Sequence, residues 1–293
     1  MSPDSNADRV EGTDLIGARR LTTAGSSALE LLAEDPLHSG LCCDFDGTIA
    51  PIVIDPEAAR PLAAALDALH ALAREMAVVA VVSGRPAMFL ADRLDLASKR
   101  SPLRGIGLHG LEEWADDGTV RLRAGVAAWR PVIESVRDQL RAAIPVGARV
   151  EDKIFGVTVH WRSAGEEGID STEVATRATE AARAVAAEHG LVPRLGKASV
   201  ELVLPLGIDK GSVVTELCGH LQAAAYIGDD TGDLLGFRAL DEQRDLHGLR
   251  SVKIAISSPE MPWGMAEAAD LVLAGPSAAA TFLAQLASCL APS

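Results

Sequence analysis

Hydrophobic residues follow two patterns that alternate along most of the chain. Short apolar strands are predicted at residues 40–45, where the run reaches Asp44, and at 76–83, where it ends at Ser83, and a third strand is predicted at 103–110. Residues 61–75 and 85–94 carry apolar positions at helical spacing. Uninterrupted apolar strands that alternate with helices are typical of a parallel sheet buried on both faces. The first part of the chain therefore predicts a parallel α/β core.

The pattern changes at Glu112. Residues 112–123 predict a hairpin around Asp117-Gly118, because their alternating positions are partly polar. Two helices are then predicted, at residues 126–144 and 172–189. Two further strand pairs are predicted, one at 149–153 with 155–162 and one at 191–196 with 198–205. This order favours a small sheet with both helices on one face, and its open face would suit a position over a substrate.

After Pro205 the first pattern returns. The predicted elements are a helix at 209–221, strands at 223–230, 251–257 and 269–274, and a last helix at 277–290. The fold class is therefore α/β, with a parallel core formed by residues 26–111 and 205–293 and a cap inserted at 112–204. Residues 1–25 have weak periodicity and predict a loose extension, with a short helix near residues 14–19.

Composition and charge limit the classes of partner. The 293 residues suffice for two domains, and 48% are hydrophobic, as a packed core requires. The net charge of -14 repels nucleic acid and anionic lipid. The N-terminus lacks the basic and apolar regions of a signal peptide, and no apolar run approaches the ~18 residues of a membrane helix. We expect a soluble, cytoplasmic protein.

The sequence contains four cysteines, Cys42, Cys43, Cys218 and Cys289, and no CxxC pair. Cys42 and Cys43 would point to opposite faces of a strand, which disfavours a bond between them. We expect buried, reduced thiols, as in a cytosolic protein. The alternative is redox control through the thiol beside Asp44.

Two acidic residues end the first apolar run. Asp44 comes first, and Asp46, Gly47 and Thr48 follow. One carboxylate can attack phosphorus, and a neighbouring acid can protonate the departing alkoxide and then accept a proton from water. Gly47 would let the backbone turn sharply and present N–H groups to phosphoryl oxygens. The alternative is a strand-ending turn without chemistry.

A second acidic cluster begins at the end of the strand at 223–230 and consists of Asp229, Asp230 and Asp233. Ligands of open parallel sheets bind at the carboxyl ends of the strands, so we expect both clusters to converge there. Two acidic clusters repel each other without a cation, and Mg²⁺ accepts one or two carboxylates with phosphate and water. Alternatively, Asp230 or Asp233 caps the helix that follows.

Two further residues suit a phosphoryl group. Lys210, between Asp209 and Gly211 at a helix start, would bring positive charge, although a single lysine is usually solvated. Ser83 follows the second strand, where its hydroxyl either binds a phosphoryl oxygen or caps the next helix.

In this order the motifs D-F-D-G-T, S-G-R, D-K-G and G-D-D-x-x-D resemble those of the haloacid-dehalogenase-like phosphohydrolases. The resemblance covers nearly the whole chain from residue 40 onward and implies a Rossmann-like core with Mg²⁺-dependent phosphoryl transfer. It makes Asp44 the nucleophile and Asp46 the general acid/base. The phosphate-binding residues that it implies are Thr48, which supports the loop, with Ser83 and Lys210. The Mg²⁺ ligands that it implies are Asp44, the Asp46 backbone carbonyl and Asp229, with Asp230 or Asp233 in support.

Further segments resemble the trehalose-6-phosphate phosphatase branch of these enzymes, namely SGRP, GLHGLEEW, EDKIFGVTVHWR and KASVELVLPLGIDKG. Substrate-binding residues carried over by position are Arg85, His109, Glu151, Lys153, His160, Arg162 and Glu201. Carboxylates and basic groups make charge-assisted hydrogen bonds to sugar hydroxyls. The alternative for each of the cap residues is a surface ion pair or a charge on a strand face, and the functional interpretation is favoured most for Lys153 and Glu201.

One segment departs from the branch, whose last motif usually reads G-D-D-x-T-D-E-D-x-F. In the sequence GDDTGDLLGF, Gly232 replaces the threonine, and Leu234 and Leu235 replace two acids. The acids on the metal side, Asp229 and Asp233, are retained. Polarity on the substrate side is reduced, which leaves the exact sugar open.

The expected function is the hydrolysis of trehalose 6-phosphate to trehalose and phosphate, a hydrolase activity of trehalose biosynthesis. One alternative is a phosphatase for another sugar phosphate, such as glucosylglycerol phosphate, sucrose phosphate or mannosylglycerate phosphate. The other is a catalytically weak paralogue that binds a sugar phosphate or a trehalose-6-phosphate synthase. Retention of Asp44 argues against the last, because a binding protein needs no nucleophile. We expect a monomer.

Overall fold

The structure is a computed structural model that describes residues 23–99, 102–162, 164, 170–196, 198–259 and 261–291. These residues form two compact units, one of Leu122–Ile208 and one of the chain segments on either side of it. The helix predicted near residues 14–19 lies outside the described residues. A helix that the sequence pattern did not predict, α1 (Thr23–Glu34), begins within the expected extension.

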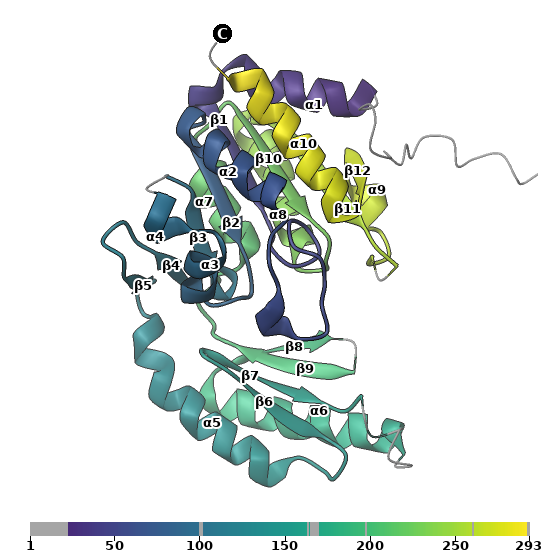
Figure 1. The fold of residues 1–293 in the computed structure, drawn as a ribbon. Coiled ribbons are helices and arrows are strands. Elements are labelled where there is room, and N and C mark those ends of the chain that lie inside the picture. The colour runs from purple at the N-terminus through teal and green to yellow at the C-terminus, as the bar shows by residue number, and fades with distance from the viewer. Residues whose placement is uncertain are drawn as a thin grey trace, which may run out of the picture. The chain divides into compact units, whose positions relative to one another are not determined.

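The larger unit is built on an eight-stranded sheet of described residues, with the order β12-β11-β10-β1-β2-β3-β4-β5 (Figure 1). All neighbours from β12 to β3 pair in parallel. The strands are β1 (Ser39–Cys43), β2 (Val78–Val82), β3 (Arg104–Gly107), β4 (Glu112–Trp114), β5 (Val120–Leu122), β10 (Ala223–Gly228), β11 (Arg250–Ser257) and β12 (Leu271–Ala274).

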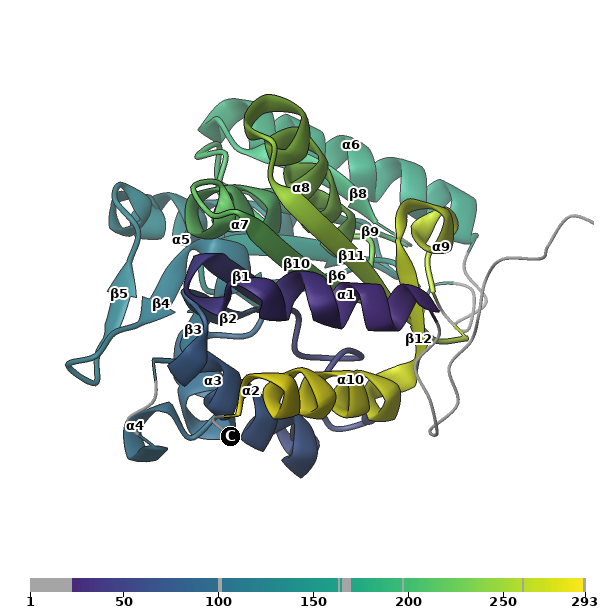
Figure 2. The same cartoon turned by 90° about the horizontal axis from the view of Figure 1, so that it is seen from above.

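Successive residues of the central strands face two different apolar clusters. Leu41 and Cys43 of β1 belong to one cluster, and Cys42 belongs to the other. Figure 2 shows α7 and α8 on one face of the sheet and α1, α2 and α10 on the other. Both faces are covered, and the central strands β1, β2 and β10 are almost entirely apolar, which confirms the predicted parallel α/β core.

The helices of this unit besides α1 are α2 (Ala63–Glu75), α3 (Ala87–Arg93), α4 (Leu96–Lys99), α7 (Lys210–Cys218), α8 (Asp233–His247), α9 (Met265–Ala268) and α10 (Gly275–Leu290). Short 3₁₀ turns lie at η1 (Pro36–His38), η2 (Pro56–Ala58) and η3 (Leu108–Gly110). Among the helices that the structure describes, none combines the length and the hydropathy needed to cross a bilayer.

The predicted hairpin of β4 and β5 extends the core sheet. Its assignment to the small sheet is wrong, because the turn at Leu108–Gly110 reverses the chain beside β3 and pairs Gly107 with Glu112 in antiparallel register. Trp114 then packs against the apolar cluster of the core. The compact second unit accordingly begins at Leu122 and not at Glu112.

The smaller unit has a four-stranded antiparallel sheet with the order β6-β7-β9-β8. Val157, Val159, Val200 and Leu202 are buried from one face, where α5 and α6 pack, while the alternate positions are mostly polar (Figure 1). The predicted sheet with two helices on one face is therefore confirmed. Its elements are η4 (Val126–Trp129), α5 (Arg130–Ala143), β6 (Arg149–Lys153), β7 (Gly156–His160), α6 (Ser171–His189), β8 (Val192–Gly196) and β9 (Ser199–Val203).

All four cysteines are free thiols. Cys42, Cys43 and Cys218 are buried as predicted, and the Sγ atoms of Cys42 and Cys218 lie 3.9 Å apart. Cys289 on α10 is exposed, so the expectation of burial is wrong for this thiol.

Candidate active site

The carboxyl ends of three neighbouring strands carry the polar residues that the sequence analysis selected. β1 pairs with β10 on one side and with β2 on the other, which places Asp44, Asp229 and Ser83 at one edge of the sheet. All three are buried, although each follows directly after an apolar strand. The parallel register thus brings together residues that lie up to 185 positions apart in sequence.

Lys210 lies at the centre of this group. Its Nζ is 3.0 Å from Oδ1 of Asp44, 2.7 Å from Oδ1 of Asp233 and 3.8 Å from Oδ1 of Asp230. Burial opposes the positive charge, yet the three carboxylates outweigh it and raise the pKa of Lys210. This lysine is almost completely buried, so the alternative of a solvated side chain is wrong.

The start of α7 fixes Lys210 in this position. Asp209 is the N-cap of the helix, and its carboxylate accepts from the Ser212 N–H while the Ser212 hydroxyl accepts from the Asp209 N–H. This capping box defines the first turn, from which Lys210 projects into the acidic cluster.

Asp233 is the most heavily hydrogen-bonded carboxylate of the group. Oδ1 accepts from Lys210 Nζ and from the Tyr226 hydroxyl, both at 2.7 Å. Oδ2 accepts from the backbone N–H groups of Asp229 and Asp230, at 2.8 and 3.0 Å. With four donors and a fully buried side chain, Asp233 organises the loop after β10.

Asp230 helps to begin the next helix. Its Oδ1 accepts from the backbone N–H of Asp233, the first residue of α8, at 3.0 Å, which is the capping role considered for it. Its side chain is largely exposed, unlike those of Asp229 and Asp233.

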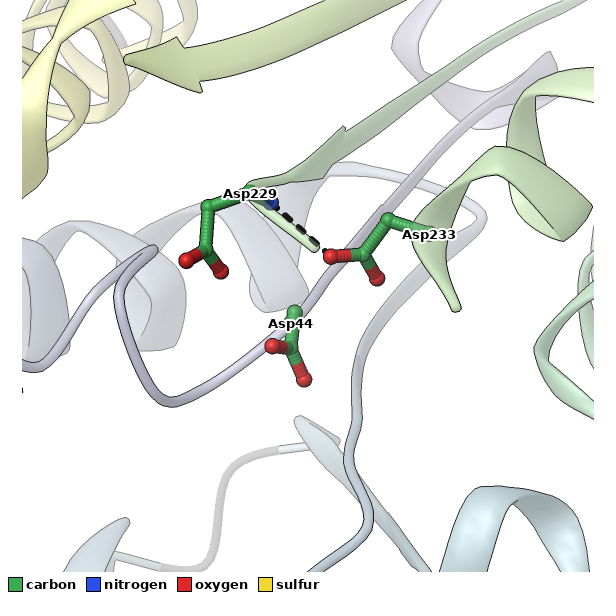
Figure 3. A group of neighbouring side chains, drawn as sticks. All are labelled: Asp44, Asp229 and Asp233. Atoms are coloured by element: carbon green, nitrogen blue, oxygen red, sulfur yellow. Dashed lines mark hydrogen bonds between the residues drawn. The ribbon is translucent and has the colours of Figure 1, made fainter. Parts of the chain in front are cut away.

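Three buried carboxylates form a candidate metal centre. One oxygen each of Asp44, Asp229 and Asp233 lies within 4.8 Å of the others, and Figure 3 shows the three neighbouring side chains. Burial raises the pKa of Asp44, against the opposing effect of Lys210, and burial with nearby Asp233 and Asp230 raises that of Asp229 to about 7. A divalent cation would relieve this crowding of hard oxygen donors.

Gly47 and Thr48 shape the loop around Asp229. Gly47 has a φ of +74°, and a Cβ at this position would collide with the Asp229 carboxylate. The Thr48 hydroxyl donates to Oδ1 of Asp229 at 3.2 Å. The backbone at Gly47 therefore lies so close to the Asp229 carboxylate that no side chain fits between them, and Thr48 contacts the same carboxylate.

Arg85 holds Asp46 through two hydrogen bonds. Arg85 Nε donates to Oδ2 at 2.7 Å, and Nη2 donates to Oδ1 at 2.9 Å. The guanidinium carbon lies 4.7 Å from the centre of the Phe89 ring. Arg85 was predicted to bind substrate, and in the structure it binds the predicted acid/base residue.

Ser83 does not cap the helix that follows it. Its Oγ accepts from the Arg85 N–H at 3.2 Å, whereas Oε1 of the buried Glu112 accepts from the N–H of Ala87, the first residue of α3, at 2.6 Å. His109 lies beside Ser83, because its N–H donates to the Ser83 carbonyl at 2.9 Å. The His109 ring packs against Gly84.

The remaining predicted substrate residues lie in the smaller unit. Glu151 is opposite Thr158, which is opposite Glu201, so this row lies on the face that α5 and α6 leave uncovered. Glu151 accepts from Lys153 and pairs with His160 Nε2 at 2.6 Å. Burial opposes the effect, but these two partners lower the pKa of Glu151. Glu151, Lys153 and His160 thus form the ion pairs considered as an alternative.

Arg162 follows β7 and is exposed. Because β7 ends at His160, the alternation of side chains along the strand does not assign Arg162 to either face of the sheet.

Three residues of the site were missed by the sequence analysis, namely Tyr226, Phe89 and Glu112. A signal existed for Tyr226, because it is the chain's single tyrosine and lies near the end of an apolar strand, where a buried hydroxyl needs a partner. Phe89 and Glu112 gave no such signal, because their roles depend on contacts made across the fold.

The chain is similar in sequence to trehalose-phosphate phosphatases. A family model described as trehalose-phosphatase matches residues 42–265. The trehalose-phosphate phosphatase of Mycobacterium marinum (strain ATCC BAA-535 / M) is 38% identical over 258 residues, which cover 84% of this chain and 60% of that protein. The corresponding protein of Mycobacterium tuberculosis (strain ATCC 25618 / H37Rv) is 33% identical over 256 residues, with 83% and 60% covered.

Solved structures support the fold. The trehalose-6-phosphate phosphatase of Aspergillus fumigatus (crystal form 3) matches with a TM-score of 0.69 and 21% identity, covering 94% of this chain and 99% of that chain. The C-terminal domain of the trehalose-6-phosphate phosphatase of C. albicans matches with a TM-score of 0.65 and 21% identity, covering 90% and 96%. These matches confirm the predicted haloacid-dehalogenase-like α/β fold. The chain spans about 60% of the length of the mycobacterial relatives.

Proposed function

Since the chain belongs to the trehalose-phosphatase family, we propose that it hydrolyses trehalose 6-phosphate to trehalose and inorganic phosphate. The observation that carries the proposal is the buried Asp44. One of its carboxylate oxygens lies 3.0 Å from Lys210 Nζ, and one lies within 4.8 Å of a carboxylate oxygen of Asp229. A buried carboxylate that is paired with a cation and placed at the edge of a parallel sheet suits nucleophilic attack on an anionic phosphate.

The proposed reaction has two steps. In the first, Asp44 forms a bond to phosphorus while the bond to the sugar oxygen breaks, and Asp46 donates a proton to that oxygen. In the second, Asp46 takes a proton from a water molecule whose oxygen attacks the aspartyl phosphate, and phosphate leaves with Asp44 regenerated. Lys210 offsets negative charge on the phosphoryl oxygens, and Ser83 offers them a hydroxyl.

The donor set near Asp44 fits Mg²⁺, which when bound would neutralise charge on the phosphoryl group. We assign direct contact to Asp44, Asp229 and the backbone carbonyl of Asp46. Asp233 is committed to four hydrogen bonds, so we assign it, with Asp230, to the support of this set.

We further propose the smaller unit as the cap that selects the sugar. Glu151, Lys153, His160 and Glu201 would supply charge-assisted hydrogen bonds to hydroxyls from one sheet face, with Arg162 beyond the strand. The same proposal includes a cytoplasmic monomer that receives its substrate from a trehalose-6-phosphate synthase.

A phosphatase for another sugar phosphate is the second candidate. It is favoured by the segment at Gly232, Leu234 and Leu235, where the trehalose branch usually carries a threonine and two acids. Leu234 packs against the apolar cluster of α7 and α8, so at this point the side chain serves packing.

The test is phosphate release by the purified chain from a panel of sugar phosphates. We expect trehalose 6-phosphate to be the best substrate, EDTA to abolish the activity and added Mg²⁺ to restore it. Asp44→Asn should lower the rate by at least about 10⁴-fold. Asp116→Asn, at an exposed aspartate, is the matched control.

Three results would count against parts of the proposal. Activity that survives Asp44→Asn would overturn the mechanism. A preference for another sugar phosphate would keep the mechanism and replace the substrate. Tight binding of trehalose 6-phosphate without hydrolysis would favour a regulatory protein.

A further inference from the structure

The side chain of Arg85 makes contacts that a substrate-binding role does not explain. The edge formed by its Nε and Nη2 donates to both oxygens of Asp46 in a bidentate pair. Both side chains are partly buried, with 20% exposure for Arg85 and 33% for Asp46. An ionised carboxylate offers about four lone-pair sites. Asp46 therefore keeps sites for a proton while Arg85 fixes the plane of the carboxylate.

Several contacts hold Arg85 itself in place. Its guanidinium lies over the Phe89 ring, and this ring meets Phe45 edge to face with centroids 5.6 Å apart. Phe45 lies between Asp44 and Asp46 in sequence and is fully buried. The aromatic pair thus connects the ring that contacts Arg85 with the residue that precedes Asp46 in the chain.

The backbone of Arg85 is fixed from the other side by a turn. The Leu108 N–H donates to the Arg85 carbonyl at 2.9 Å. Leu108 and His109 have φ values of 48° and 58°, in the left-handed region that residues with side chains rarely adopt. A Cβ at Gly107 would collide with the backbone of Ala87. Such conformations persist where the surroundings over-determine them, and they cluster at functional sites.

We propose that Arg85 is a positioning residue for Asp46, which it orients toward the oxygen of the scissile ester. The inference rests on the proposed function, since it takes Asp46 as the proton donor in formation of the aspartyl phosphate. The proton moves from Asp46 to the bridging oxygen as the bond from that oxygen to phosphorus breaks. Arg85 exchanges no proton and keeps the carboxylate in the plane from which this transfer occurs.

Two substrates with different leaving groups distinguish this role from phosphate binding. A sugar alkoxide needs a proton as it departs, whereas p-nitrophenolate departs readily without one. The constant kcat/KM covers the steps through phosphoryl transfer to Asp44, so it excludes the later attack by water. General acid catalysis is worth about 10²–10⁴-fold, and this is the range open to a residue that positions the acid.

We expect Arg85→Ala to lower kcat/KM for trehalose 6-phosphate by about 10²-fold or more, and for p-nitrophenyl phosphate by less than about 5-fold. Arg85→Lys should recover only part of the loss, because an ammonium group cannot span both carboxylate oxygens. Asp46→Asn should show the same dependence on leaving group. The double variant Arg85→Ala/Asp46→Asn should be no slower than Asp46→Asn alone.

Arg93→Ala is the matched control. The Arg93 guanidinium also lies over Phe89, at 4.6 Å, but it hydrogen-bonds to Asp92 and to the carbonyls of Glu57 and Ala59. We expect both substrates to be hydrolysed by this variant at close to the wild-type kcat/KM.

An equal loss on both substrates with a raised KM would make Arg85 a phosphate ligand and overturn the inference. So would a loss in Arg93→Ala as large as in Arg85→Ala, which would indicate disruption around Phe89. If the wild type does not cleave trehalose 6-phosphate, the proposed function fails. The comparison is then made with the sugar phosphate that is cleaved best, so the two claims are decided separately.

Discussion

Gly47 sets how closely the two acidic loops of the site approach each other. It combines a left-handed backbone, φ +74°, with a position where any side chain meets the Asp229 carboxylate. Gly248 has the same φ of +74°, but nothing lies within 4 Å of a Cβ added there. The two glycines therefore separate backbone strain from steric collision.

We predict that Gly47→Ala lowers phosphatase activity by about 10²-fold, because a displacement of about 1 Å in a catalytic group can cost that much. Gly248→Ala should retain near-normal activity despite equal backbone strain. The measurement is kcat/KM for trehalose 6-phosphate in both variants, with thermal unfolding to compare their stability. Equal activity in the two variants would contradict the role assigned to Gly47.

The raised pKa of Asp229, about 7, has a consequence for stability without metal. Because this value lies above the ordinary 3.8, the folded state holds a proton that the unfolded state has lost over the range between them. The contribution of Asp229 to stability is thus complete below about pH 4 and is lost as pH rises through about 7.

We predict that Asp229→Asn, which cannot ionise, gains stability relative to wild type between pH 5 and pH 8 in EDTA. The melting temperature of each form gives the comparison, and each kcal/mol corresponds to about 2–4 °C for a domain of this size. Magnesium at pH 8 should stabilise the wild type and not the variant. A difference in melting temperature that does not change with pH would contradict the raised pKa.

At the scale of elements, the hairpin β4–β5 contacts the start of α3, the helix that follows β2. Buried Glu112 of β4 accepts from the Ala87 N–H at 2.6 Å and so satisfies the first turn of α3. This helix follows directly after Ser83 and Arg85. An element predicted to belong to the cap therefore supports the candidate active site.

We predict that Glu112→Ala lowers the free energy of unfolding by about 1–3 kcal/mol, since it leaves a buried N–H group without its acceptor. Glu112→Gln keeps an acceptor oxygen and should recover part of the loss. Chemical denaturation of the three forms checks this. If Glu112→Ala were as stable as wild type, the capping contact would not contribute to folding.

The predictability of the elements follows from the range of the interactions that define them. The parallel strands were predictable because burial on both faces leaves an uninterrupted apolar run, as in β1 and β2. The hairpin alternates in the same way whichever sheet it joins, and the pairing of Gly107 with Glu112 decides the outcome. Helix α1 carried a signal that was missed, since Ala28, Leu29 and Leu32 have helical spacing and are buried.

The same distinction applies to the site. Asp44, Ser83, Lys210 and Asp229 could be selected because each stands at the end of an apolar strand or the start of a helix. The contact between Arg85 and Asp46 joins two loops that are 39 positions apart, and no local sequence pattern predicts this contact.

At the scale of the whole molecule, the net charge of -14 makes the placement of each cation informative. Lys210 is buried among Asp44, Asp230 and Asp233, where it offsets part of their charge. The chain forms two compact units, and the candidate catalytic residues all belong to the larger one. The chemistry is thus proposed for the larger unit, and the choice of sugar for the smaller one.

In the proposed mechanism, Asp44 carries the phosphoryl group during turnover. The most direct measurement mixes the protein with trehalose 6-phosphate and Mg²⁺, quenches the reaction in acid within milliseconds and locates the bound phosphoryl group by peptide mass spectrometry. We predict a phosphorylated peptide with the modification on Asp44, absent from Asp44→Asn. Phosphate release without any phosphorylated peptide, or with the modification on another residue, would contradict the account.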